Sequence, residues 1–275
     1  VGDAMATTIW GASSSWTLTA LPLFVWMGEI LFRTKLSENL FKGLAPWMQR
    51  LPGGLIHVNV VGCALFAAIS GSSAATVATV GKMSIPELRK RKYPEKILLG
   101  SLAGSGTLGL LIPPSIILII YGVTVQESIA KLFIAGIIPG IMIALIFMSY
   151  VIVWSLINKK SMPKSNENSS FLEKVKKSKQ LMPVVLLILA VIGSIYTGIA
   201  TATEAASLGV VGALILSYLQ KSLNIETFKD SLLGATKTSC MIAFILAGAT
   251  FLSLAMGFTG LPRNLAIWIQ SMELS

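Results

Sequence analysis

The sequence predicts an all-α polytopic membrane protein, chiefly because of where its charged residues lie. The 275 residues include only 22 Lys or Arg and 12 Asp or Glu. A helix needs roughly 20 apolar residues to cross the hydrocarbon core, and most of the charge-free stretches reach that length. A soluble domain would carry charge on its exposed helix faces, and β-barrel strands would alternate over about ten residues, so the pattern excludes both classes. The charge-free stretches are 4–28, 51–81, 97–126, 132–158, 180–203, 205–220 and 238–262.

Residues 1–50 are expected to form a scaffold span and an interfacial helix. The span covers about 16–32 and ends near Glu29 and Arg33, which lie one helical turn apart and are expected to pair. A role in ion coupling is the alternative for Glu29. Residues 36–50 repeat apolar side chains at helical spacing, a pattern that suits a helix lying in the membrane interface.

Residues 51–125 are expected to form one hairpin and one broken helix, because both of the charge-free stretches in this segment are interrupted at mid-depth. Small polar residues at 70–76 interrupt the first stretch, and non-helical backbone at that depth must be enclosed by protein or a water-filled cavity. Basic residues flank this stretch on both sides, which predicts a re-entrant helical hairpin with its tip at 70–76. Glycines followed by Pro113-Pro114 interrupt the second stretch and predict a broken helix, with halves at about 98–108 and 115–123.

The remaining sequence predicts a span within 126–158, a cytoplasmic loop at 159–181 and the start of a second inverted repeat at 182–275. One helix over residues 183–220 would be about 57 Å long, so a turn is expected near 200–204, with Thr203 as the cap of the next helix and a capping role for Glu204. The last span is expected at about 238–258. Residues 44–49 resemble 265–270, and each run follows a span of opposite direction, which is a frequent transporter plan. If this repeat is real, a second hairpin and a second broken helix follow Ser275, and the chain is a fragment.

The basic residues predict the orientation of these segments. If residues 51–81 re-enter and every other segment crosses once, 20 of the 22 Lys and Arg fall on one side. Lys and Arg are retained on the cytoplasmic side, so the mouth of the hairpin is expected to open there. The net charge of +10 therefore indicates membrane orientation and no nucleic-acid partner.

The two interruptions, at 70–76 and 106–115, are expected to carry the chemistry. A broken helix leaves carbonyl groups that can hold Na⁺, and N–H groups that can hold a carboxylate beside serine hydroxyls. Packing through small residues is the alternative explanation for either run alone. His57 is expected to be a hydrogen-bonded residue near the hairpin mouth. The chain is not expected to be an enzyme, because Ser72 has only the distant His57 as a base and no catalytic motif occurs. A non-transporting assembly subunit is the other class considered.

Several runs of the sequence resemble the large membrane subunit of tripartite ATP-independent periplasmic (TRAP) transporters. That family usually has Thr-Pro-Thr-Glu where this chain has Thr201-Ala202-Thr203-Glu204, and a turn is expected in either case. The resemblance implies an elevator-type transporter in the bacterial inner membrane that couples Na⁺ to uptake of an organic acid, such as a C4-dicarboxylate or a sialic acid. It also implies two partners, a small membrane subunit and a periplasmic substrate-binding protein. The matching runs are Leu51–Leu55, His57–Val60, Ser70–Thr76, Gly109–Ser115, Leu132–Gly140 and Thr203–Ala206.

The same resemblance implies site residues. Those for the substrate are Ser72, Ser73 and Thr76, and those for a first Na⁺ site are Ser70, Ser73, Gly109, Ile112 and Pro113. A second ion site would lie beyond this sequence. A carboxylate permease of related two-hairpin architecture that works without a binding protein is the alternative within transport.

Overall fold

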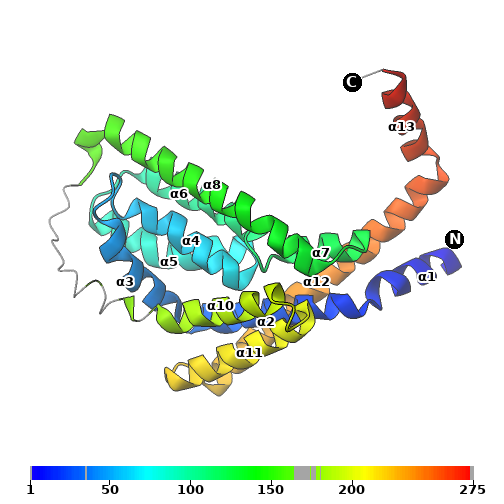
Figure 1. The fold of residues 1–275 in the computed structure, drawn as a ribbon, viewed down its shortest axis with the longest axis horizontal. Helices are drawn as coiled ribbons and strands as arrows, with labels where there is room; N and C mark the ends of the chain where they lie inside the picture. Colours follow the sequence, from blue (N-terminus) through cyan, green and yellow to red (C-terminus); the bar gives the residue numbers. More distant parts are fainter. Residues whose placement is uncertain (1, 35, 164–173, 175–177, 180, 273–275) are drawn as a thin grey trace.

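The computed structural model describes residues 2–34, 36–163, 174, 178–179 and 181–272, and every element within these ranges is helical (Figure 1). Three of the helices, α8, α11 and α12, are long and apolar enough to cross a membrane. A fourth span results if the bent pair α1 and α2, which meet at 59°, is counted as one. The elements in chain order are α1 (Gly2–Ser13), η1 (Trp16–Thr19), α2 (Ala20–Arg33), α3 (Leu36–Met48), α4 (Ile56–Ser70), α5 (Ser73–Lys90), α6 (Glu95–Gly106), η2 (Thr107–Leu110), α7 (Ile116–Val125), α8 (Ile129–Ile157), η3 (Lys159–Ser161), α10 (Met182–Tyr196), α11 (Ala202–Leu219), α12 (Ile225–Phe258) and α13 (Leu261–Ser271).

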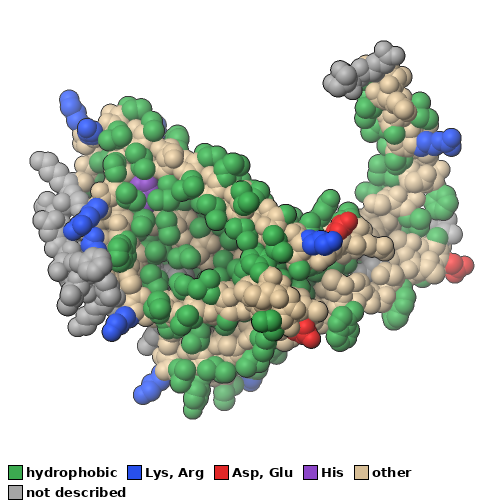
Figure 2. Space-filling model, viewed as in Figure 1, with side chains coloured by type: hydrophobic (Ala, Val, Ile, Leu, Met, Phe, Trp, Pro, Cys, Tyr) green, Lys and Arg blue, Asp and Glu red, His purple; other side chains and the backbone are tan. Residues whose placement is uncertain are grey.

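The outer faces of the long helices carry large apolar side chains that the rest of the described chain leaves uncovered. Phe244 on α12 is 82% exposed and Ile138 on α8 is 78% exposed. Such a surface is unfavourable in water, whereas lipid tails cover it readily. Figure 2 shows blue Lys and Arg side chains mainly at the end of the molecule where α8 finishes, and an apolar middle. This distribution confirms the predicted multi-pass helical membrane protein.

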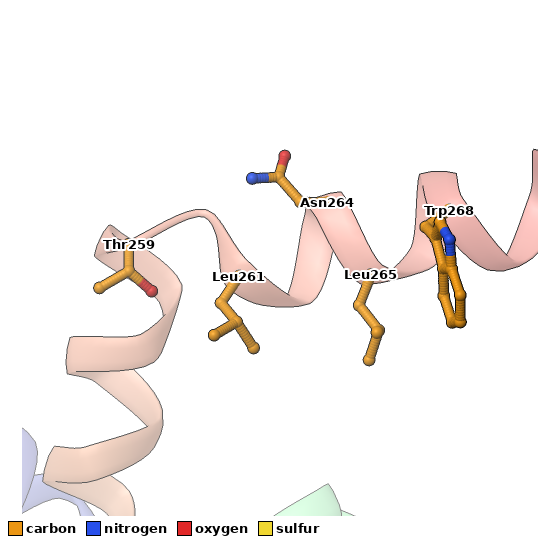
Figure 3. A pocket seen from close by; sticks show the side chains of 5 residues that line it. All are labelled: Thr259, Leu261, Asn264, Leu265 and Trp268. Atoms are coloured by element: carbon orange, nitrogen blue, oxygen red, sulfur yellow. The ribbon is translucent and has the colours of Figure 1, made fainter.

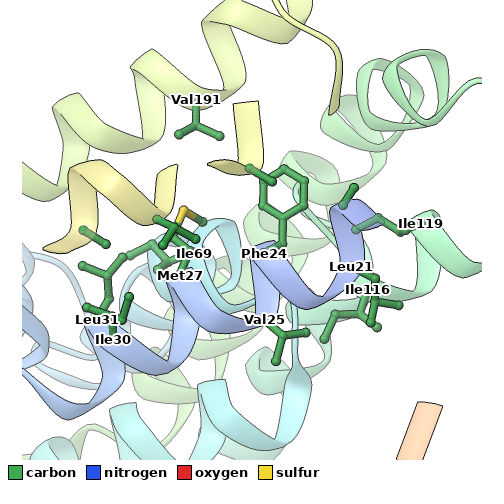
Figure 4. Close-up of a cluster of buried hydrophobic side chains, with 14 of the residues drawn as sticks. Leu21, Phe24, Val25, Met27, Ile30, Leu31, Ile69, Ile116, Ile119 and Val191 are labelled. Atoms are coloured by element: carbon green, nitrogen blue, oxygen red, sulfur yellow. The ribbon is translucent and has the colours of Figure 1, made fainter. Parts of the chain in front are cut away.

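Helix α2 forms the centre of the larger apolar core (Figure 4). Its Phe24 ring meets Phe133 of α8 edge-on, with ring centroids 6.0 Å apart. The same core contains Ile69 at the end of α4 and Ile116 at the start of α7, so α2 supports both interrupted segments. Because lipid tails are as apolar as these side chains, close packing rather than exclusion of water stabilises the core. The buried apolar residues of α2 recur at helical spacing: Ala20, Leu21, Phe24, Val25, Met27, Ile30 and Leu31.

Polar contacts join α2 to α12. The Arg33 Nε donates to Glu29 Oε2 at 3.0 Å, which confirms the predicted pair, and the Arg33 guanidinium also lies 3.7 Å from Asp230 of α12. The Trp26 indole N–H donates to Ser231 Oγ at 3.2 Å. Helix α12 begins at Ile225, well before the expected start at 238. The charged residues before 238 mark the edge of the apolar stretch, and they do not end the helix.

The turn between α10 and α11 carries a capping box. The Thr201 hydroxyl accepts from the Glu204 N–H at 3.3 Å, and the Glu204 carboxylate accepts from the Thr201 N–H at 2.8 Å. The expected capping role of Glu204 is confirmed, but the prediction of Thr203 as the cap is wrong. A capping box requires the hydroxyl residue three positions before the Glu, and Thr201 meets that spacing.

Helix α3 covers the base of the segments that follow it. Its Leu44 is buried against Val58 of α4 and Leu88 of α5. The helix covers most of the expected range 36–50. Its buried face packs against α4 and α5.

Candidate functional site

Helices α4 and α5 form a helical hairpin whose turn consists of Gly71 and Ser72. Gly71 adopts a left-handed conformation with φ of 58°, and its N–H closes α4 by donating to Ala67 O at 3.0 Å. Ser72 is extended, and its hydroxyl caps α5 by accepting from the Ala75 N–H at 3.4 Å. Glycine tolerates positive φ and serine is a preferred N-cap, so this pair of residues ends one helix and starts the next. The predicted helical hairpin is confirmed, with a tip narrower than the expected 70–76, and its re-entry into the membrane stays a prediction.

The second interrupted segment is a broken helix. Helix α6 ends at Gly106, the short 3₁₀ turn η2 follows, and α7 begins at Ile116. Within the break, Leu108 O accepts from the N–H groups of Leu111 and Ile112 at 3.0 and 2.9 Å. The Ser115 hydroxyl donates to Leu110 O at 2.6 Å. The predicted break is confirmed, and its half-helices span 95–106 and 116–125.

The hairpin tip lies against both sides of the break. Gly71 O accepts from the Ile116 N–H at 3.2 Å, and a Cβ added at Gly71 would lie 2.6 Å from Pro114 O. On the other side, a Cβ added at Gly109 would lie 2.9 Å from both Ser72 C and Ser73 N. The two backbones can approach this closely only because both positions lack a side chain. The structure thus brings Gly109 together with Ser72 and Ser73.

Hydroxyl groups gather at the tip. The Ser70 and Thr76 hydroxyls are 3.0 Å apart, and Ser70 Oγ also donates to Ser72 O at 3.3 Å. The Ser73 hydroxyl is buried and has no hydrogen-bond partner among the described residues. A buried polar group without a partner costs about 1–3 kcal/mol, which makes this hydroxyl a candidate ligand position. Thr76 is itself completely buried behind the tip, where it holds Ser70.

Ile112 and Pro113 contact α8. A Cβ added at Gly140 would lie 2.9 Å from Ile112 Cγ1, and one added at Gly136 would lie 3.5 Å from Pro113 Cγ and 2.8 Å from Leu111 O. Both side chains are apolar, so only the backbone oxygens of these two residues have ligand chemistry.

Three glycines that sequence reasoning did not select support the site. The broken helix packs against Gly136 and Gly140 of α8. Gly28 of α2 faces the hairpin tip, and a Cβ added at Gly28 would lie 2.8 Å from Ser70 Cα. Spacing of small residues by four positions was a visible signal for the pair on α8. Gly28 stands alone in an apolar run and gave no signal.

A buried hydrogen-bond network ties the hairpin arm α4 to α6. The Asn59 side-chain N–H₂ donates to Leu98 O at 3.2 Å and to Ser101 Oγ at 3.0 Å. The Ser105 hydroxyl donates to Asn59 O at 3.4 Å. Because α4 leads to the tip and α6 leads to the break, these bonds keep the two halves of the site in register.

Two further features lie away from the tip. His57 Nε2 is 2.8 Å from Pro52 O at the base of the hairpin, so the expected hydrogen-bonded role is confirmed. An open groove of about 390 Å³ lies where α12 meets α13, lined by residues of that one segment (Figure 3). None of the predicted site residues lines it. The lining residues are Thr259, Leu261, Asn264, Leu265 and Trp268.

Fold and site together define a multi-pass helical membrane protein in which a hairpin tip is set into a broken helix. The sequence matches, over residues 1–275, the family described as "Tripartite ATP-independent periplasmic transporter, DctM component". The chain belongs to this family, as its sequence motifs predicted.

Similar proteins carry the names of TRAP permeases with different substrates. The chain is 32% identical to the C4-dicarboxylate TRAP transporter large permease protein DctM of Pseudomonas aeruginosa, over 99% of the chain and 63% of that protein. It is 32% identical to the sialic acid TRAP transporter large permease protein SiaM of Vibrio cholerae, over 93% of the chain and 60% of that protein. It is 33% identical to the ectoine/5-hydroxyectoine TRAP transporter large permease protein UehC of Ruegeria pomeroyi, with the same two coverages of 93% and 60%. The chain thus spans about three fifths of the length of these curated relatives.

Proposed function

We propose that the chain supplies the first hairpin and the first broken helix of a permease that couples Na⁺ to uptake of an organic acid across the bacterial inner membrane. The observation that carries this proposal is the Ser73 hydroxyl, which is buried where the hairpin tip meets Gly109 and has no hydrogen-bond partner among the described residues. The complete transporter would work as an elevator, with the hairpin and the break moving together against α2 and its neighbours.

The ion chemistry follows from the groups at the tip. Na⁺ is a hard cation that binds oxygen atoms, and broken helices in transporters hold it with backbone carbonyl groups. Ser70 and Ser73 would supply hydroxyl oxygens, and Gly109, Ile112 and Pro113 would supply backbone oxygens. The bound ion would satisfy the Ser73 hydroxyl.

The substrate would bind at the start of α5. The first N–H groups of a helix point away from it and carry a partial positive charge, which favours a carboxylate. Ser72 and Ser73 lie at this end, and Ala74 beside them is exposed. Thr76 lies one turn deeper and would act through Ser70. A carboxylate is common to C4-dicarboxylates, sialic acids and ectoine, the compounds for which the three relatives are named.

The partners of the complete transporter would be a small membrane subunit and a periplasmic substrate-binding protein. Family membership supports both. Uptake by the complete permease with and without the binding protein tests this part. Equal uptake in both cases would favour the permease type that works without one.

Na⁺-dependent uptake by the complete permease carrying Ser73→Ala tests the ion site. We expect the Na⁺ concentration for half-maximal uptake to rise about tenfold, equivalent to about 1.4 kcal/mol of lost binding energy. Ser84→Ala is the matched control, because the Ser84 hydroxyl on the same helix is also buried and unpartnered among the described residues. Ser84 lies eleven residues further along α5, about 16 Å from Ser73. If both variants keep the wild-type Na⁺ dependence, the site assignment is wrong.

A further inference from the structure

The base of the hairpin, at the opposite end from the tip, carries five exposed lysines that we call the basal lysines: Lys90, Lys92, Lys96, Lys159 and Lys160. Three of them lie between the end of α5 and the start of α6, and two lie in η3 after α8. One apolar cluster joins these segments, because Tyr93 and Ile97 pack with Trp154 and Met162. The packing therefore gathers lysines from two distant stretches of the sequence onto one surface.

Two acidic residues that the structure describes in this region, Glu87 and Glu95, already pair with arginines. Arg91 Nε donates to Glu87 at 2.8 Å, and Arg89 Nε donates to Glu95 at 2.7 Å. No ion pair involves a basal lysine within the part of the chain that the structure describes. The surface thus keeps a concentration of positive charge that no described acidic residue neutralises.

Exposed apolar side chains lie directly beside the basal lysines. Leu99 follows Lys96 by three residues and is 44% exposed, while Leu156 and Ile157 precede Lys159 and are 47% and 76% exposed. A free anion or a soluble acidic protein would contact the charges and leave these side chains in water. A phospholipid contacts both, because its phosphate pairs with lysine and its acyl chains cover the leucine and isoleucine side chains.

We propose that the basal lysines bind the headgroups of anionic phospholipids in the leaflet that the hairpin base faces. A single basic side chain near an anionic membrane surface strengthens binding about fivefold. Several basal lysines acting together would make the hairpin base a preferred position for anionic lipids over zwitterionic ones. This site lies on the hairpin itself, so the lipid would hold the base of the segment whose tip carries the proposed ion site.

The test is lipid retention by the purified complete permease, independent of Na⁺ and of transport. The protein is equilibrated with equal amounts of phosphatidylglycerol and phosphatidylethanolamine in detergent, and the retained lipids are quantified by mass spectrometry. The variant combines Lys90→Gln, Lys92→Gln and Lys96→Gln. The control combines Lys221→Gln, Lys229→Gln and Lys237→Gln, which removes the same charge from exposed positions on the α11–α12 side.

We expect the wild type and the control to retain more phosphatidylglycerol than phosphatidylethanolamine. In the basal variant, the ratio of the two retained lipids should fall at least tenfold while the melting temperature stays unchanged. Equal preference in the basal variant and the wild type would overturn the proposal. An equal loss in basal and control variants would overturn it as well, because net charge alone would then explain retention. A basal variant that unfolds is replaced by Lys159→Gln with Lys160→Gln, for which we expect a loss in the same direction.

Discussion

Replacing Gly109 with Ala should separate the hairpin tip from the helix break. The added Cβ would lie 2.9 Å from Ser72 C and Ser73 N, and 3.1 Å from Ser72 O. Ordinary carbon contacts lie at about 3.5–4.0 Å, so the tip must retreat by roughly 0.5–1 Å. Such overpacking costs about 1–3 kcal/mol. The proposed Na⁺ ligands come from both sides of this contact, so we expect Na⁺ affinity to fall by tenfold or more.

Gly100→Ala is the matched control for this substitution. Gly100 lies in α6, and a Cβ added there meets nothing within 4 Å. Replacing a helical glycine with alanine in open space stabilises a helix by up to about 1 kcal/mol. The assay is thermal unfolding of the purified complete permease together with its Na⁺ dependence of uptake. If Gly109→Ala behaves like Gly100→Ala in both measurements, the close approach of tip and break is not required.

Three further substitutions test other parts of the account. Gly71→Ala should lower the melting temperature, because an alanine in the left-handed conformation costs about 1–2 kcal/mol and its Cβ would lie 2.6 Å from Pro114 O. An unchanged melting temperature would argue against the geometry of the hairpin tip. Asn59→Leu should destabilise the protein by about 1–3 kcal/mol and weaken Na⁺ binding, because it removes the hydrogen bonds that tie α4 to α6. If this variant loses stability but keeps the wild-type Na⁺ affinity, the network has a structural role only. Thr201→Ala should cost about 0.5–2 kcal/mol without altering Na⁺ dependence, whereas Thr203→Ala should be nearly neutral; equal melting temperatures for these two variants would contradict the capping box.

Sequence reasoning located the interruptions because glycine, serine and proline act on the backbone locally. The Gly71-Ser72 turn needs no distant neighbour to end α4, and Pro113-Pro114 locally prevent a helix from continuing between η2 and α7. The i,i+4 pair of Glu29 and Arg33 was predictable for the same reason.

The contacts that complete the site depend on tertiary packing. Helical periodicity gives the face of a helix that is buried, but it does not identify the neighbour of that face. The contact of Gly28 with Ser70 and the meeting of Arg33 with Asp230 are of this kind. Charge patterning also placed the start of α12 too late, because charged residues leave the apolar layer while the helix continues.

The proposed Na⁺ site at the hairpin tip is tested most directly by Na⁺ binding, measured as thermal stabilisation of the purified complete permease with K⁺ as the reference ion. Na⁺ at ten times its Kd should stabilise the wild type by about 1.4 kcal/mol relative to K⁺. We predict that Ser84→Ala keeps this Na⁺-specific stabilisation and that Ser73→Ala loses most of it. Equal Na⁺ stabilisation in the two variants would contradict a Na⁺ site at the hairpin tip.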